Sequence, residues 1–323
     1  MTSNPRLDIL TLINGFQITQ AIHVASTLRV ADHLKDGPRS SDELASLTKS
    51  HAGSLYRLLR ALAAVGIFRE NENRTFALTP MGDCLRTDSA TPISAWAEYV
   101  GSPYVWRTWG HLQHSIQTGE NAFQSVNGKG IWEYHTEHPE LGAVFDRSMT
   151  ELSRGAVEAV IGAYDCGHGL MLAAILSAHP NMRGTLFDLP GVAAGAKSVL
   201  EKRGVIDRCN IVGGSFFEAV PEGGDAYIMR VVIHDWEDNE AIAILRTCRR
   251  TMKEVAKLIL IERIVAPANE IPATKFGDLN MLVMPGGRER TREEFSDLFA
   301  KSGFELSRVA PAGNVNVIEA RPC

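Results

Sequence analysis

The residues best suited to chemistry lie in the run Ile233-His234-Asp235-Trp236-Glu237-Asp238. This run follows an apolar segment that predicts a buried strand over residues 226–232, and it precedes an amphipathic helix expected over residues 239–252. Open α/β sheets bind ligands beyond the carboxyl ends of their strands. Histidine takes up a proton most readily near neutral pH. His234 is therefore a candidate general base; the alternative is a histidine that caps the helix or is hydrogen-bonded in the core.

Two glutamates are expected near this histidine. Glu262 belongs to the apolar strand predicted over residues 257–264, where a carboxylate needs a partner. Glu289 lies in a loop before a helix predicted over residues 291–301, and taken alone it could be a solvated acid in the first helical turn. Together they could orient and charge-stabilise one imidazole, because a base needs a third group that fixes its tautomer.

Asp188 is a candidate ligand for a nucleotide. It follows the strand predicted over residues 184–187, about 20 residues beyond Gly169, which is where nucleotide-binding folds place an acid for the ribose hydroxyls. The alternative is an N-cap for the helix that begins near Gly191.

The second half of the chain alternates strands and helices, which predicts a parallel, doubly wound sheet. Further strands are expected at 209–212, 305–309 and 316–320, and further helices at 170–177 and 191–203.

The first half has a helical pattern that ends in a winged helix: helices over residues 41–45 and 54–62 precede a hairpin of residues 67–70 and 75–79. We expect a capping serine at Ser41, and a buried stripe at Ile18, Ile22, Ala25, Leu28 and Ala31. Arg57 and Arg60 on the second helix raise a DNA-binding alternative, but no basic patch surrounds them. The excess of apolar residues favours dimerisation.

The composition argues against several classes of protein. A net charge of -5 and a pI near 6.1 disfavour a general binder of nucleic acid or acidic membranes. No apolar run reaches the roughly 18 residues of a membrane span, and the first residues lack the order of a signal peptide. The 5 scattered cysteines predict reduced thiols, not a zinc site or disulfides. We therefore expect a cytoplasmic protein with no metal.

The order of these motifs resembles that of the S-adenosylmethionine (SAM)-dependent O-methyltransferases, a family of plant caffeate and flavonoid enzymes and bacterial natural-product enzymes. The resemblance covers nearly the whole chain and includes Phe-Asp-Leu-Pro at 187–190, His-Asp-Trp-x-Asp at 234–238 and Gly-Gly-Arg-Glu-Arg-Thr at 286–291. It implies an α/β fold: a Rossmann-like doubly wound methyltransferase domain (155–323), preceded by a mainly helical winged-helix dimerisation domain (1–95) and a helical linker and substrate-pocket segment (96–154). It also implies a homodimer formed through the N-terminal domain, with neither nucleic acid nor membrane as a partner.

The resemblance implies a role for each matching residue. The reaction would transfer a methyl group from SAM to a hydroxyl of a small aromatic or natural-product acceptor, with His234 as general base held by Glu262 and Glu289. SAM, and S-adenosylhomocysteine as product, would contact Gly167, Gly169, Asp188, Leu189, Ser215, Phe216 and Arg230. The acceptor would contact Phe145, Met149, Asp235 and Met281.

The chain departs from the family pattern in the glycine loop. The family has an apolar strand followed by Asp-x-Gly-Gly-Gly-x-Gly, whereas residues 163–170 read Ala-Tyr-Asp-Cys-Gly-His-Gly-Leu. About a dozen residues, enough for a strand and its loop, are missing between Asp165 and Cys166. Three explanations compete: a deletion that impairs SAM binding, a replacement strand at residues 160–163, or a scaffold that is inactive in methyl transfer or catalyses a non-methylating reaction. Ser215 also replaces an acid that contacts the adenine.

Overall fold

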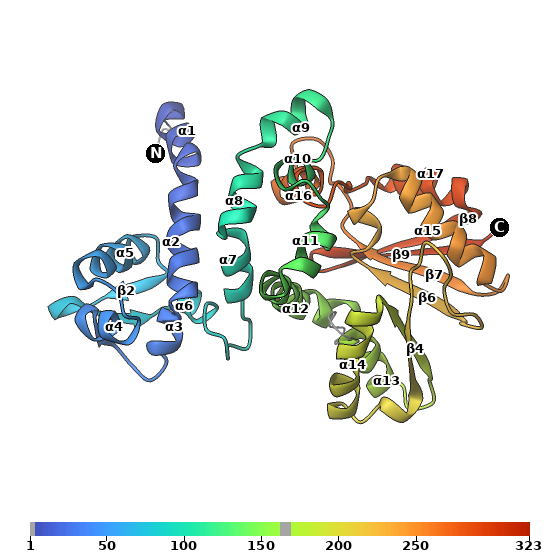
Figure 1. The fold of residues 1–323 in the computed structure, drawn as a ribbon, viewed down its shortest axis with the longest axis horizontal. Helices are drawn as coiled ribbons and strands as arrows, with labels where there is room; N and C mark the ends of the chain where they lie inside the picture. The colour runs from blue at the N-terminus through green and yellow to red at the C-terminus, as the bar shows by residue number, and fades with distance from the viewer. Residues whose placement is uncertain (1–3, 162–168) are drawn as a thin grey trace. The chain divides into compact units, whose positions relative to one another are not determined.

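The computed structural model describes the backbone of residues 4–161 and 169–323, and the side chains of residues 4–152 and 169–323. The chain forms two compact units (Figure 1). The first comprises residues 1–107 and 138–152, and the second comprises residues 108–137 and 153–323. Two features of the sequence analysis lie outside the described residues: the junction between Asp165 and Cys166, and Gly167. The replacement strand predicted at 160–163 lies partly outside them.

The first unit contains the predicted winged helix. Helices α4 (Ser41–Leu47) and α5 (Ala52–Ala64) precede the hairpin of β2 (Phe68–Glu70) and β3 (Thr75–Leu78), and β3 also pairs with the short β1 (Arg39–Ser40). Leucines of α5 and the phenylalanines of the hairpin lie in the core of this unit. The helix cap is Ser40 and not Ser41 as predicted, because Ser40 and Glu43 form a reciprocal capping box. The other elements of this unit are α2 (Gly15–Thr27), α3 (Val30–His33), η1 (Glu72–Arg74), α6 (Pro80–Asp83) and α7 (Ser94–Val100). Helix α8 (Pro103–Trp109) and the long helix α12 (Pro139–Ile161) begin in this unit, and their last residues belong to the second.

The N-terminal helix α1 (Pro5–Ile13) is an apolar helix without a buried residue. Leu7, Leu12 and Ile13 are each more than half exposed. The predicted stripe, which runs from α2 into α3, is buried or half-buried at Ile22, Ala25, Leu28 and Ala31, whereas Ile18 is 41% exposed in the single chain. Ile18 lies in the amino-terminal half of α2, where the winged-helix core no longer covers the helix. The amino-terminal helices of a single chain thus carry an uncovered apolar surface.

The second unit contains the predicted alternation of strands and helices. Its strands are β4 (Gly184–Asp188), β5 (Cys209–Gly213), β6 (Ala226–Arg230), β7 (Lys257–Glu262), β8 (Phe304–Ala312) and β9 (Val315–Pro322). Its helices are α9 (Leu112–Thr118), α10 (Ala122–Asn127), α11 (Ile131–Glu137), α13 (Leu170–Ala178), α14 (Pro190–Lys202), α15 (Asp238–Thr251), α16 (Pro272–Val283) and α17 (Arg292–Ser302), with short 3-10 turns η2 (Ile206–Arg208) and η3 (Ile233–Asp235). Among residues 4–161 and 169–323, no helix is long and apolar enough to cross a membrane.

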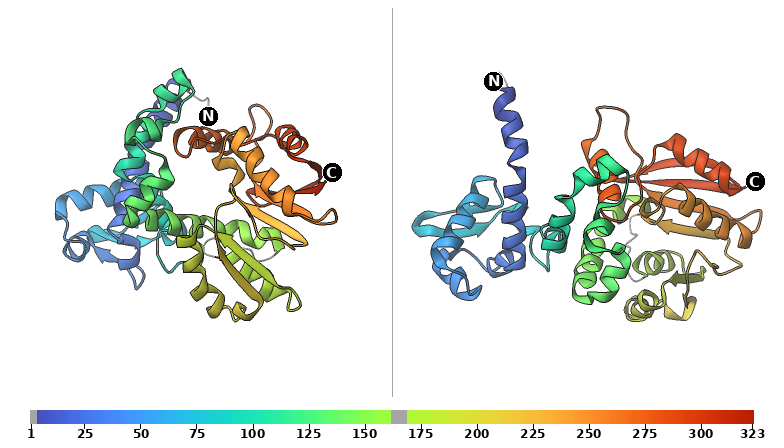
Figure 2. Two further views of the ribbon diagram at one scale, coloured as in Figure 1. Left: turned by 45° about the vertical axis from the view of Figure 1, so that its right-hand side comes forward. Right: turned by 45° about the horizontal axis from the view of Figure 1, so that its top comes forward.

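The strands of the second unit form two separate sheets, which Figure 2 shows in two views. β4 pairs in parallel with β5, and helices α13 and α14 pack against this pair. The other sheet has the order β6-β7-β9-β8. The expectation of an entirely parallel sheet was wrong for β9, which runs antiparallel to both neighbours. A connection of only two residues separates β8 from β9, and such a hairpin joins antiparallel strands.

The division of the sheet falls where a doubly wound fold places its first strand. In the order 3-2-1-4-5, that strand lies between the second and the fourth, which correspond here to β4 and β6. Within the described part of the chain, no strand joins these two. None of the residues of β4, β5 or β6 is fully buried, whereas most of β7 is. Inner strands of such sheets are normally covered on both faces, so these strands are unusually exposed.

Candidate active site

His234 lies in η3, directly beyond the carboxyl end of β6. The backbone turns sharply between the two elements at Val231, which has a φ of +45°. A β-branched residue strongly disfavours this conformation, so surrounding contacts must hold it. The Val231 N–H donates to the carbonyl of Ile261, and the N–H groups of Val232 and Ile233 donate to Glu262 Oε1 at 3.0 and 2.9 Å. The strand end that carries Glu262 therefore stabilises the strained entry to the histidine.

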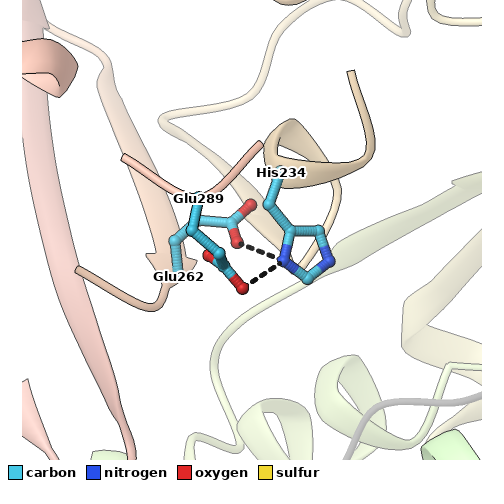
Figure 3. Close-up of side chains that lie close together, drawn as sticks. All are labelled: His234, Glu262 and Glu289. Carbon is cyan, nitrogen blue, oxygen red and sulfur yellow. Dashed lines mark hydrogen bonds and ion pairs between the residues drawn. The ribbon is translucent and has the colours of Figure 1, made fainter. Parts of the chain in front are cut away.

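The imidazole of His234 contacts both predicted glutamates (Figure 3). Its Nδ1 lies 3.1 Å from Glu289 Oε1 and 3.8 Å from Glu262 Oε2. Both carboxylates are wholly buried, and only 10% of the imidazole is exposed. A hydrogen bond from Nδ1–H to Glu289 selects the tautomer in which Nε2 is unprotonated. This tautomer leaves Nε2 able to accept a proton.

The cluster is rich in negative charge. Within the described residues, Glu262 Oε2 and Glu289 Oε2 are buried without a hydrogen-bond partner. Arg263 Nη1 lies 3.5 Å from Glu289 Oε1 and offsets part of this charge. The donor atoms of His234, Glu262 and Glu289 lie within 4.8 Å of one another, a set that could also hold a divalent cation.

This charge sets the protonation of the imidazole. Burial lowers the pKa of His234, but the carboxylates of Glu262, Asp235 and Glu289 outweigh burial and raise it to about 9. Burial also raises the pKa of Asp235 to about 7, although the neighbouring His234 opposes that rise. Burial likewise raises the pKa of Glu262. Asp235 Oδ1 lies 3.4 Å from His234 Nε2, so a third carboxyl group, besides the two glutamates at Nδ1, flanks the proton-accepting nitrogen.

The loop that carries Glu289 makes close backbone contact with the histidine. The Arg288 N–H donates to the His234 carbonyl at 2.9 Å, and the Glu289 N–H donates to Asp278 Oδ1 at 2.9 Å. A side chain at Gly287 would overlap the carbonyl oxygen of His234 and the backbone of Asp235. Only glycine allows the two segments to approach this closely.

Five of the predicted cofactor residues, Asp188, Leu189, Ser215, Phe216 and Arg230, end or follow β4, β5 or β6. Asp188 ends β4 with an exposed side chain and accepts the N–H of Leu189 at 2.7 Å. The alternative of Asp188 as a helix N-cap was wrong, because α14 begins at Pro190 with Leu189 as its N-cap residue. Ser215 and Phe216 follow β5, and Arg230 ends β6.

Two further features define the packing around these strand ends. Gly169 precedes α13 with a φ of +84°, where a Cβ would lie 3.4 Å from Leu186 and Ala196. The rings of Phe216 and Phe217 lie edge to face with Trp236, at centroid distances of 6.1 and 4.8 Å. This aromatic cluster connects the segment after β5 with the segment that carries His234.

The predicted acceptor residues are divided between the two units. Asp235 and Met281 belong to the second unit, and Met281 is 7% exposed on α16. Phe145 and Met149 belong to the first unit, on α12, where the ring of Phe145 packs against Tyr99. Each pair is therefore described only within its own unit.

Several contributors at the site were not predicted, among them Val231, Gly287 and Arg290. The adjacent glycines at 286 and 287 are a signal for close backbone approach. The sequence carries no comparable signal for Val231 or Arg290. The positive φ of Val231 and the burial of Arg290 both arise from tertiary contacts.

Comparisons with known proteins agree with the geometry. Residues 109–305 match the family described as O-methyltransferase domain, and residues 10–88 match the O-methyltransferase dimerisation domain. A phenazine O-methyltransferase from Lysobacter antibioticus is 40% identical, covering 97% of this chain and 95% of the relative. A mitomycin biosynthesis 6-O-methyltransferase from Streptomyces lavendulae is 38% identical, covering 96% and 93%.

Solved structures of similar proteins give the same result. The crystal structure of LaPhzM has a TM-score of 0.94 at 39% identity, covering 99% of this chain and 100% of that one. The neocarzinostatin O-methyltransferase NcsB1, in complex with SAM and 2-hydroxy-5-methyl naphthoic acid, has a TM-score of 0.82 at 34% identity, covering 95% and 96%. The predicted fold class is confirmed, and the chain belongs to the SAM-dependent O-methyltransferases, whose members similar to it serve bacterial natural-product biosynthesis.

Proposed function

We propose that this enzyme methylates a hydroxyl group of a small aromatic natural product, with His234 as the general base. One observation carries the proposal: the Nδ1 of a buried imidazole is bound to Glu289 at 3.1 Å, which leaves Nε2 as the nitrogen that can accept a proton. This arrangement has the pattern of a base oriented by a third group.

The residues at the strand ends fit SAM. The exposed carboxylate of Asp188 offers oxygen acceptors for two ribose hydroxyls. Phe216 and Phe217 offer aromatic rings, and Ser215 a hydroxyl, in the segment after β5, the strand that pairs with β4. Gly169 would place the amino-terminal end of α13 near the ligand, with Leu189 and Arg230 at the neighbouring strand ends. When bound, SAM supplies a methyl group that is already activated for displacement.

The protein would then contribute alignment and proton removal. The Nε2 of His234 would take the proton of the acceptor hydroxyl as the oxygen attacks, and Glu262 and Glu289 would stabilise the imidazolium that forms. Asp235, beside Nε2, would hydrogen-bond to the acceptor. Met281, buried on α16, would contribute an apolar contact that favours an aromatic acceptor.

The acceptor class follows from the relatives. The names of three relatives refer to a phenazine, to mitomycin biosynthesis and to a dihydroxylated naphthoate. A phenazine and a naphthoate are both fused aromatic ring systems, and we propose a hydroxylated acceptor of this class for the present enzyme.

The test is methyl transfer from SAM to a panel of hydroxylated phenazines, naphthoates and quinones, followed by mass spectrometry. We expect His234→Gln to lower turnover by at least about 100-fold, since general bases contribute about 10²–10⁴-fold. The exposed His179, in the same unit, is the control: His179→Gln should retain activity. Full turnover by His234→Gln, or conversion of an acceptor without consumption of SAM, would overturn the proposal.

We also propose that the chain is a homodimer. The matched dimerisation domain supports this, as do the exposed apolar side chains of α1, which no part of the described chain buries. Packing against α1 and α2 of a second copy of the chain would remove this apolar surface from water.

A further inference from the structure

We infer that Arg290 is a positioning residue for the reaction: its buried guanidinium fixes residues 233–238, and so holds the His234 imidazole against Glu289. The inference rests on the proposed function, in which His234 is the base.

The guanidinium of Arg290 contacts the chain on both sides of His234. Only 1% of Arg290 is exposed. Its Nη1 donates to the carbonyl of Ile233 at 3.1 Å, and its Nη2 donates to the carbonyl of Trp236 at 2.9 Å. Nε and Nη2 also donate to Asp238 Oδ1, at 3.0 and 2.8 Å. One planar group thus holds the residue before the histidine, the second residue after it and the first residue of α15.

The backbone of Arg290 connects the same segment to the end of β7. Its carbonyl accepts the N–H of Val265 at 2.9 Å, and Arg290 forms an isolated β-bridge with Ile264. Arg290 also directly follows Glu289 in the chain, so the carboxylate and the guanidinium share one short backbone segment. Any displacement of residues 233–238 relative to this segment would change the distance between Nδ1 of His234 and Oε1 of Glu289.

No other side chain could replace this arrangement. A guanidinium presents five donors in a fixed plane, whereas an ammonium is a compact point charge. Lysine could reach Asp238 or one carbonyl, but not Asp238 and the carbonyls of Ile233, Trp236 and Arg288 together. Asp238 is 46% exposed on its side chain and can be hydrated. With lysine at position 290, the carbonyls of Ile233 and Trp236 would instead have fewer hydrogen-bond donors. Residues 233–238 would therefore shift, and the position of the His234 ring would change.

The first test compares Arg290→Lys with Arg292→Lys, the same substitution at an exposed position of α17. The readout is the ¹⁵N signal of His234 in the folded protein, assigned with His234→Gln. We expect the titration midpoint of His234 to fall by about one pH unit in Arg290→Lys, because the charged hydrogen bond to Glu289 weakens. Arg292→Lys should leave it unchanged. A purely structural role would lower the melting temperature but leave the His234 signal of the folded protein unmoved, and that result would overturn the inference.

Turnover supplies an independent readout. With the acceptor identified in the panel, we expect Arg290→Lys to lower kcat by about 100-fold, as misplacement by about 1 Å does elsewhere, while KM for SAM changes less than about threefold. Addition of millimolar guanidinium to Arg290→Ala should restore part of kcat. If Arg290→Lys does not fold, Asp238→Asn removes only the ion pair, and it should shift the His234 midpoint in the same direction by less. An unmoved midpoint in that variant refutes the inference.

The two proposals fail in different ways. If His234→Gln retains turnover, the proposed function fails. If His234→Gln is inactive while Arg290→Lys keeps both wild-type kcat and the wild-type His234 midpoint, only the role of Arg290 fails.

Discussion

Glu289→Gln is the substitution that most directly probes the charge around His234. It keeps the size of the side chain and an oxygen acceptor for Nδ1–H, but it removes a negative charge 3.1 Å from the ring. A hydrogen bond to a charged group contributes about 1.5–3 kcal/mol, and 1.36 kcal/mol corresponds to one pKa unit. The pKa of His234, raised to about 9 in the wild type, should therefore fall by about one to two units.

This change has a definite sign in three measurements. At pH 7 the neutral fraction of His234 should rise from about 1% to between about 10 and 50%. The turnover of the wild type should increase with pH up to about 9, because the base must be neutral. Glu289→Gln should reach its maximal turnover at a lower pH, and that maximum should be smaller than the maximum of the wild type. The folded pKa lies above the ordinary value, so His234 stabilises the folded state fully below about pH 6.5 and loses that contribution as the pH rises through about 9. Glu289→Gln should remove part of this stabilisation.

The assay is a ¹⁵N NMR titration of histidine-labelled protein, which requires no acceptor. Glu293→Gln is the matched control, since Glu293 is an exposed acid in the first turn of α17. An unchanged His234 midpoint in Glu289→Gln would refute the reasoning that the buried carboxylates set the protonation of this ring. An equal shift in Glu293→Gln would refute the assignment of that effect to the 3.1 Å contact.

Three other changes have expected outcomes. Gly287→Ala should lower turnover by about 100-fold, because a Cβ would displace the His234 backbone; Gly191→Ala, where a Cβ meets no atom within 4 Å, is the control, and equal activities would contradict the close approach. Leu12→Glu, at a side chain of α1 that is 75% exposed, should convert the dimer into a monomer, as measured by analytical ultracentrifugation. The control Val255→Glu should remain dimeric. If Leu12→Glu also remains dimeric, the apolar surface of α1 is not the dimer interface. Insertion of about a dozen residues between Asp165 and Cys166, to supply a first strand between β4 and β6, should raise the melting temperature and tighten SAM binding in calorimetry; no change in either would show that the two sheets need no further strand.

Much of the fold was predictable because its signals are local. The strands and helices of the second unit follow from hydrophobic periodicity, and most of the predicted bounds agree with the structure to within a few residues. The largest differences have physical causes. The strand predicted to extend to Val232 ends at Arg230, because Val231 adopts a positive φ. The antiparallel β9 depends on the hairpin that precedes it.

The site was predictable in part for the same reason. His234, Glu262 and Glu289 each follow or end a recognisable strand or precede a helix, so a common sheet edge brings them together. The role of Arg290 was not predicted, because an arginine before an exposed helix is usually solvated. Only the tertiary fold places backbone carbonyls around its guanidinium. The exposure of Ile18 was likewise not local, because it depends on what the winged-helix core fails to cover.

We propose that His234 removes the acceptor proton while separate residues hold SAM. The most direct test measures both properties on one variant: SAM affinity by calorimetry and methyl transfer by mass spectrometry for His234→Gln. We predict wild-type SAM affinity with turnover reduced by at least about 100-fold. Wild-type turnover by this variant would contradict the account.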